Sequence, residues 1–243
     1  VLNEGTEILE RSCFSHQKSG SGSYTLHIPA SVKVIDGPPR AQATAYTVAE
    51  DNPNYCAVDG VLYTMDMKTL IAYPQSKIME EFRIPDGVET ISFYAFYGAS
   101  IGKLIIPPSV KVIEARIGEH ANIKEVYFED GSKLESTGSY MFYLAGGLTN
   151  IRYPENTAIP LLSMINNSHA DQYKHFTVPN KITSIGYLSG NLPNLETLTY
   201  NAENADITTE KLFDSSAPYD LIIGDQVNHL PAKFDCIVSP SKA

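Results

Sequence analysis

The chain has 243 residues, of which 43% are hydrophobic and 19% are charged, a composition typical of a folded protein with slightly few charges. Its formal net charge is −10, so nucleic-acid backbones and anionic membrane surfaces would repel it and are not expected partners. No stretch approaches the ~20 consecutive apolar residues of a membrane-spanning helix, so no transmembrane segment is predicted within this sequence.

The first 22 residues lie before the repeated part of the chain, and we expect them to form an N-terminal cap. They begin at Val1 without the apolar core of a signal peptide, so we expect either that a signal peptide has been removed or that the sequence was trimmed. The stretch Gly20-Ser21-Gly22-Ser23 would link this cap flexibly to the residues that follow.

Three cysteines, Cys13, Cys56 and Cys236, are too few and odd in number for a disulfide framework. We expect each of them to be a buried free thiol, the usual state of an isolated cysteine. A bridge between Cys13 and Cys56 is the alternative that the sequence leaves open.

Residues 54–74 are expected to be an insertion, because the unit from Ala43 to Met79 is about 14 residues longer than a 22-residue unit. Asp59-Gly60 lies between apolar residues, which is a strong signal for a tight turn. We expect residues 61–63 and 70–73 to pair as a hairpin around Asp66. The simplest role of this hairpin is to extend a sheet locally, and the functional alternative is a projecting contact surface.

From Met79 onward, the pattern hydrophobic-x-x-hydrophobic-x-hydrophobic recurs with steps of 22, 22, 25, 25 and 22 residues. A fixed period in this range predicts a solenoid, in which each unit buries its apolar face against its neighbours. Counting weaker matches at both ends, about nine units fill residues 23–235, and 236–243 form a C-terminal tail. The clear copies are Met79-Phe82-Ile84, Ile101-Leu104-Ile106, Ile123-Val126-Phe128, Leu148-Ile151-Tyr153, Tyr173-Phe176-Val178 and Leu195-Leu198-Tyr200.

Each unit has two halves. The first is extended and usually closes with a proline such as Pro85, because proline cannot donate to a sheet ladder. The second begins with an apolar pair spaced by three, such as Val88 and Ile91, and an aromatic residue often follows, as Phe96 and Phe142 do. We expect these aromatics to plug the solenoid from short helical turns on its convex side. Longer independent helices are disfavoured, because no sustained helical stripe of apolar residues is present.

Two stretches carry a family pattern: Phe82-Arg83-Ile84-Pro85-Asp86-Gly87-Val88-Glu89-Thr90-Ile91-Ser92-Phe93-Tyr94-Ala95-Phe96 and Leu104-Ile105-Ile106-Pro107-Pro108-Ser109-Val110-Lys111-Val112-Ile113. They resemble the units of BspA-like leucine-rich-repeat proteins, and the segment from Asn52 to Pro74 resembles a hairpin-bearing unit of that family. The family usually ends a unit with Ala-Phe and a nearby cysteine, of which only Ala95-Phe96 is intact here.

This resemblance implies a leucine-rich-repeat solenoid of the α/β-type repeat class, rich in β-structure. It implies a parallel sheet on the concave face, with short strands and helical turns on the convex face. It also implies a bacterial protein that is secreted or held at the cell surface, often as a lipoprotein. Adhesion to host proteins or other cells is implied by a few members of the family.

Motifs for catalysis or cofactor binding are missing from the sequence. We find no nucleophile elbow, phosphate-binding loop, dinucleotide fingerprint or His-Glu-x-x-His metal motif. The six histidines are scattered, without the spacing of metal ligands. Neighbouring carboxylates such as Glu129-Asp130 are best interpreted as solvated turn charges. We therefore predict a protein without catalytic residues, metal site or cofactor.

The concave face is the candidate binding surface, because solenoids present such surfaces to partners. In each strand, the residue between the last two apolar positions points away from the core, and the residue two positions earlier shares that face. Arginine and tyrosine on this face are typical of interface hot spots. The alternative is that charges such as Glu81 only form stabilising cross-strand pairs. The candidate residues are Arg83, Lys103, Glu125, Tyr127, Arg152 and His175.

Two functional hypotheses follow from these observations. The first is a non-catalytic secreted or cell-surface module that binds a protein or a glycan, with host extracellular-matrix proteins among the candidate partners. The second is a structural domain of a larger surface assembly. The sequence does not identify the ligand, the mode of anchoring, the oligomeric state or whether the hairpin of residues 54–74 contacts a partner.

Overall fold

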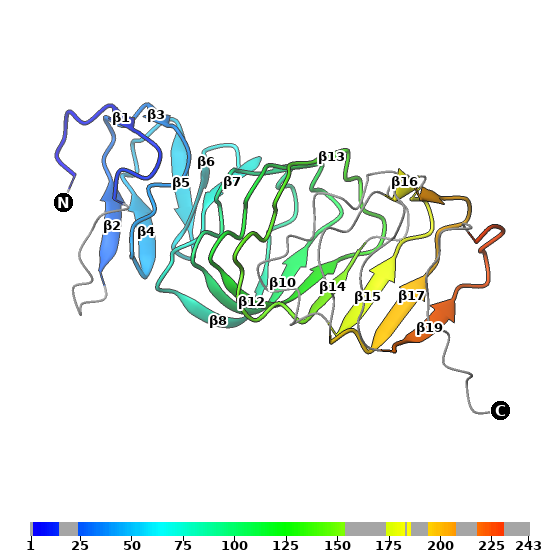
Figure 1. Ribbon diagram of the computed structural model, residues 1–243. Helices are drawn as coiled ribbons and strands as arrows, with labels where there is room; N and C mark the ends of the chain where they lie inside the picture. Colours follow the sequence, from blue (N-terminus) through cyan, green and yellow to red (C-terminus); the bar gives the residue numbers. More distant parts are fainter. Residues whose placement is uncertain are drawn as a thin grey trace.

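The computed structural model describes residues 2–14, 24–153, 174–182, 184–185, 194–207 and 218–230. The described chain is a solenoid, in which strands of successive coils lie side by side along one axis (Figure 1). All regular elements in these ranges are β-strands, so no helix there could cross a membrane.

The longest strands form a seven-stranded parallel sheet with the order β19-β17-β15-β14-β12-β10-β8. Phe82, Leu104 and Val126 occupy equivalent register positions in successive strands, as the repeat pattern predicted. The strands are β8 (Ile78–Arg83), β10 (Ser100–Ile106), β12 (Asn122–Phe128), β14 (Asn150–Arg152), β15 (His175–Val178), β17 (Thr197–Tyr200) and β19 (Asp220–Ile223).

The second halves of the coils contribute short strands to a six-stranded sheet with the order β13-β11-β9-β7-β6-β5. Strands β7, β9, β11 and β13 run parallel, whereas β5, β6 and β7 are antiparallel neighbours. The strands are β5 (Tyr55–Val58), β6 (Val61–Thr64), β7 (Thr69–Ala72), β9 (Thr90–Ile91), β11 (Val112–Ile113) and β13 (Ser136–Thr137).

The predicted hairpin pairing is confirmed, because Leu62 pairs with Ala72 across β6 and β7. A second hairpin joins β5 to β6 through Asp59 and Gly60, whose φ angles of 50° and 78° suit a tight turn. A Cβ on Gly60 would lie 2.9 Å from the Cβ of Ala45, so the turn packs closely against the preceding coil. The insertion therefore extends the six-stranded sheet, which is the simpler of its two predicted roles.

Three pairs of parallel strands complete the described part of the fold. The N-terminal pairs confirm that the weak matches before the insertion are coils of the solenoid, although the predicted domain boundaries remain predictions. These pairs are β1 (Ile8–Leu9) with β3 (Val34–Ile35), β2 (Thr25–Ile28) with β4 (Ala45–Val48), and β16 (Ser184–Ile185) with β18 (Asp206–Ile207).

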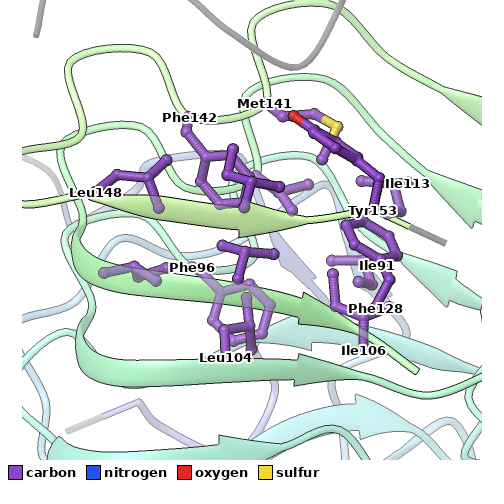
Figure 2. Close-up of a cluster of buried hydrophobic side chains, with 14 of the residues drawn as sticks. Ile91, Phe96, Leu104, Ile106, Ile113, Phe128, Met141, Phe142, Leu148 and Tyr153 are labelled. Carbon is purple, nitrogen blue, oxygen red and sulfur yellow. The ribbon is translucent and has the colours of Figure 1, made fainter. Parts of the chain in front are cut away.

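The hydrophobic core lies between the two large sheets. Leu104, Ile106 and Phe128 of the long strands belong to the same buried cluster as Ile91 and Ile113 of the short strands (Figure 2). Burying one such side chain contributes about 1.5–3 kcal/mol. Successive coils from β6 onward add side chains to this cluster, so it forms a column along the solenoid axis. The coils of β1 to β4 pack in a second cluster, which also contains Leu62 and Ile71.

The helical turns predicted for the convex side are wrong, since the described segments there are turns without a helical ladder. In residues 92–99, the amide of Ala95 donates to a carbonyl three residues earlier, at 3.0 Å. The amides of Phe96 and Gly98 instead donate to carbonyls of the next coil, at 2.7 and 3.0 Å. Tyr94 is also left-handed, with a φ of 60°, which a right-handed helix does not allow.

The predicted aromatic plugs are nevertheless buried, with Phe96 0% and Phe142 2% exposed. Gly118 occupies the equivalent position in the coil between them, and its amide donates to the carbonyl of Met141 at 2.7 Å. A Cβ on Gly118 would lie 2.5 Å from Cδ1 of Phe142. The ring of Phe142 therefore occupies the space that a side chain at residue 118 would need.

The cysteine prediction is partly wrong. Cys13 and Cys56 are both free thiols, so the alternative bridge between them is not formed. Cys13 is exposed, because it lies in a turn of the N-terminal segment and not in the core, whereas Cys56 is half-buried. Cys236 lies outside the described residues, as do Phe234 and the Gly20–Ser23 link.

Gly118→Ala should destabilise the protein by about 1–3 kcal/mol, because the added methyl group overlaps the ring of Phe142 and forces the core to shift. Urea unfolding followed by circular dichroism measures the change. Gly146→Ala is the matched control, because no atom lies within 4 Å of its Cβ position. Equal urea midpoints for the two variants would show that the core accommodates a methyl group at residue 118 without strain.

Asn52 is 1% exposed and holds the start of the hairpin segment through four hydrogen bonds. Its Nδ2 donates to the carbonyls of Pro29 and Val32, at 2.9 and 3.2 Å. Its Oδ1 accepts from the amides of Asn54 and Tyr55, at 2.8 and 3.0 Å. The side chain therefore joins the insertion to the preceding coil.

Asn52→Ala should cost at least about 2 kcal/mol of stability, because several buried backbone groups lose their partners. Thermal unfolding and urea unfolding both report the loss. Asp51→Ala, at the exposed neighbouring position, is expected to change stability by less than ~0.5 kcal/mol. An Asn52→Ala variant with unchanged stability would mean that water replaces these hydrogen bonds.

Candidate functional site

The candidate site lies on the outward face of the seven-stranded sheet. The register places Glu81, Lys103 and Glu125 in one column, which continues to Asn150 and His175. A second column two residues later contains Arg83, Ile105, Tyr127 and Arg152, on β8, β10, β12 and β14. All six predicted residues therefore lie on the strands and in the columns that the repeat pattern assigned.

Arg83 is held by two carboxylates. Its Nε and Nη2 donate to Oε1 and Oε2 of Glu129, at 2.9 and 2.8 Å, and Nη2 also donates to Oδ1 of Asp86 at 2.8 Å. The hydrogen bonds that Arg83 donates to Glu129 raise the pKa of Arg83, and the guanidinium lowers the pKa of Asp86. The side chain of Arg83 keeps 38% of its surface exposed, so part of the guanidinium still faces solvent.

The ion pair between Arg83 and Glu129 explains why Ile105, an outward-facing residue, is buried. Glu129 follows β12, so the side chain of Arg83 spans β10 to reach it. Ile105 of β10 lies in the same outward column and is only 8% exposed. The repeat pattern predicts an outward position for Ile105, because it lies between Leu104 and Ile106, and the register agrees. The neighbouring long side chains cover it, and the centre of this face is therefore apolar beneath a polar layer.

Tyr127 contacts a cation from each neighbouring strand. Lys103 Nζ lies 4.9 Å from the centre of its ring, and Arg152 Cζ lies 4.6 Å from it. Arg152 also donates from Nη1 to the hydroxyl of Tyr127 and from Nη2 to Oδ1 of Asp130, the latter at 3.0 Å. These contacts fix the ring on the sheet surface, and Lys103 in turn pairs with Glu81 at 3.8 Å.

The structure joins three of the six predicted residues by direct contacts, places Arg83 in the same outward column and leaves two apart. Lys103, Tyr127 and Arg152 form one set of contacts, and Arg83 lies beside them through Glu129 and Ile105. Glu125 and His175 are exposed, and the register places β14 between their strands. Within the described residues, Lys103 forms its ion pair with Glu81 and not with Glu125.

Three partners of the site were missed from the sequence: Asp86, Glu129 and Asp130. The pair Glu129-Asp130 was assigned to a solvated turn, but the two residues bind Arg83 and Arg152 on opposite sides. The available signal was position, because all three carboxylates lie just beyond the carboxyl ends of β8 and β12, where long side chains of neighbouring strands converge.

The chemistry of this face is recognition by charge-assisted hydrogen bonds and aromatic contacts. Asp86, Glu129 and Asp130 accept hydrogen bonds from the guanidinium groups of Arg83 and Arg152, and for Asp86 the pairing with Arg83 lowers the pKa. In the described part of the chain, no three His, Cys, Asp or Glu side chains are arranged to hold a metal ion. A shallow pocket of about 200 Å³ lies at the other end of these strands, beside Ile78, Gly102 and Lys124.

The repeat geometry agrees with a known family. A model of the BspA type leucine-rich repeat region, in six copies, matches residues 72–189 and 132–218, which together are more than half of the chain. The chain belongs to the BspA-type leucine-rich repeat family. A comparison with curated protein sequences found no match.

Solved structures with a similar fold are bacterial leucine-rich-repeat proteins and an antigen. A leucine-rich repeat protein from Eubacterium ventriosum is 22% identical, with a TM-score of 0.55 over 79% of this chain and 59% of its own. The pneumococcal vaccine antigen PcpA is 18% identical, with a TM-score of 0.52 over 90% of this chain and 59% of its own. This chain thus spans about 59% of the length of either protein, and the likeness shows the fold.

A leucine-rich cell surface protein from Faecalibacterium prausnitzii is also similar, at 21% identity and a TM-score of 0.48. The alignment covers 79% of this chain and 48% of that protein.

Arg83→Gln should raise the pKa of Asp86 towards its ordinary value, because the guanidinium that stabilises the carboxylate is removed. A pH titration followed by NMR of the carboxyl carbons measures this change, and Lys181→Gln, which breaks a pair with Glu203, is the control.

The sign of the linked stability effect follows from the same shift. The folded pKa of Asp86 lies below its unfolded value, so the pair stabilises the fold above the unfolded pKa. This contribution is lost as the pH falls through the folded pKa, and the Arg83→Gln variant should lack it. An unchanged Asp86 titration in that variant would mean that the ion pair does not form in solution.

Proposed function

We propose that this chain is a non-catalytic binding module that acts in secreted form or at the bacterial cell surface. In this proposal it recognises a protein or a glycan through the outward face of the seven-stranded sheet. Membership of the BspA-type leucine-rich repeat family supports this location, because secretion or surface anchoring is expected for the family. Secretion, a lipid anchor and host extracellular-matrix partners remain parts of the proposal.

One observation carries the assignment of the face. Arg83 is held by the carboxylates of Glu129 and Asp86. Tyr127 and Arg152 are held by their contact with each other and by Asp130. A surface that is ordered before binding loses less side-chain entropy when a partner docks. Arginine and tyrosine are also the residues that dominate binding energy at interfaces.

The face carries both signs of charge, which favours a partner of mixed charge over a simple polyanion. The cations of Arg83 and Arg152 are each 38% exposed, and the carboxylates of Asp86 and Asp130 are 76% and 74% exposed. Exposed charges of this kind contribute mainly to orientation and to the association rate. Binding at this face should therefore weaken as the salt concentration rises.

A structural role in a larger surface assembly is the second candidate function. It is favoured by β19, where Ile222 and Ile223 are 51% and 39% exposed on the last described strand of the sheet. Exposed apolar side chains on a strand at the edge of a sheet mark a surface that packs against another domain or chain.

The purified chain should give a salt-sensitive hit in a screen against extracellular-matrix proteins and a glycan array at two salt concentrations. The double variant Arg83→Ala with Tyr127→Ala should weaken that hit by at least about tenfold, because it removes the guanidinium and the ring at the centre of the face. Circular dichroism confirms that the variant is folded.

Thr177→Ala with Thr199→Ala is the matched control, because both residues lie in the same outward column on β15 and β17. Undiminished binding by the Arg83 and Tyr127 variant would exclude this face. A blank in both screens would favour the assembly role, which a pull-down from the native cell surface then tests.

A further inference from the structure

A second surface lies along the turns that precede the long strands. Residues 92–99, 114–121 and 138–145 form three stacked turns, one in each successive coil. The amide of Phe96 donates to the carbonyl of Ile117 at 2.7 Å, and the amide of His120 donates to that of Tyr143 at 3.1 Å. Each turn is thus bonded to the next like neighbouring strands, which are ~4.8 Å apart.

Four tyrosines and one arginine project from these turns. We call this surface, made of Tyr94, Tyr97, Arg116, Tyr140 and Tyr143, the tyrosine edge. Tyr94 and Tyr97 lie in the first turn with ring centres 5.6 Å apart, and Tyr140 and Tyr143 lie in the third with centres 5.9 Å apart. Arg116 lies in the turn between them, with its Cζ 5.4 and 5.1 Å from the centres of the Tyr140 and Tyr143 rings.

The backbone of the tyrosine edge does not favour these side chains. Tyr94, Arg116 and Tyr140 have φ angles of 60°, 55° and 60°, in the left-handed region where glycine or asparagine is preferred. The conformation costs a non-glycine residue about 1–2 kcal/mol. Packing does not compensate fully, because Tyr140 is 48% exposed. Large side chains kept in such a conformation on a surface point to function.

Charged groups beneath the rings hold them in place. Arg40 reaches from an earlier coil, with its Cζ 4.5 and 3.4 Å from the centres of the Tyr94 and Tyr97 rings. Glu119 is 6% exposed and pairs with Arg116 at 2.7 Å and with Arg40 at 3.8 Å. Two guanidinium groups therefore share the carboxylate of Glu119, and Arg116 keeps 35% of its side chain exposed at the surface. A second carboxylate, Glu114, lies in the same turn and accepts from the amide of Phe93 at 2.6 Å.

We propose that the tyrosine edge binds a proline-rich segment in the polyproline II conformation, with an acidic side chain facing Arg116. The two tyrosine pairs are two coils apart, about 9.6 Å. A polyproline II helix repeats every three residues, about 9.3 Å, so prolines one turn apart would reach both pairs. Aromatic side chains are the usual recognition surface for such segments. Arg116, midway between the pairs, supplies the complementary charge.

This surface is separate from the sheet face of the proposed function. In every coil, the turn with the tyrosine edge leads into the amino end of a long strand, such as β10 after residues 92–99. The carboxylates that hold Arg83 and Arg152 follow the carboxyl ends. Variants of one surface therefore leave the other intact, and the two proposals can fail independently.

The test uses the full chain and a fluorescent peptide of ten prolines interrupted by one central glutamate. Fluorescence anisotropy should show saturable binding, and Tyr140→Gly should weaken it about tenfold or more. Glycine suits the left-handed φ at this position, so the variant is expected to fold. Leu144→Gly is the matched control, because Leu144 has a φ of 55° in the same turn and carries no aromatic ring.

Two further peptides separate the contributions of conformation and charge. A glycine-serine peptide with the same glutamate should not bind, and a proline peptide with a central lysine should bind more weakly than the glutamate form. Equal binding by the glycine-serine peptide, or unchanged binding by Tyr140→Gly, would overturn the proposal. Glycan binding that needs the same tyrosines, without proline-peptide binding, would also overturn it.

Discussion

The fold depends on one constraint, which is that every coil must form backbone hydrogen bonds with the coil before and after it. This requirement holds in the long strands, in the short strands and in the turns between them. Equivalent residues are therefore stacked about 4.8 Å apart along the solenoid axis. Each position of the repeat becomes a column, and its neighbours in that column decide which side chain it can hold.

Columns explain which features the sequence could predict. The apolar columns through Phe82 and Leu104 form the core, and their spacing in the sequence gives the register of the long sheet directly. The outward columns follow from the same register, so the face that carries Arg83 and Tyr127 could be located in advance. The tight turn at Asp59 and Gly60 was also visible, because few other residues accept that backbone.

Other features depend on contacts that no single repeat contains. Arg83 and Glu129 are 46 positions apart and belong to coils that are not adjacent, so no local pattern joins them. The turn at residues 92–99 resembles a helical turn in its apolar spacing. Its alternate amides bind the next coil, and a pattern within one unit cannot show that choice. The tyrosine edge could not be predicted, because its residues belong to three turns whose stacking becomes visible only once the coils are aligned.

The narrow position at Gly118 has a consequence for how such a chain can change length. Repeat arrays grow and shrink by gain or loss of whole units. Deleting the coil with Gly118 would place the Cβ of Phe96 beside the turn of Phe142, where the ring of Phe142 now fills the space of a Cβ. That ring would have to turn, because adjacent coils accept two aromatic rings only when the rings stack, as those of Phe128 and Tyr153 do with centres 6.0 Å apart. Gain or loss of a coil at this place is therefore expected to need a compensating change at Phe142.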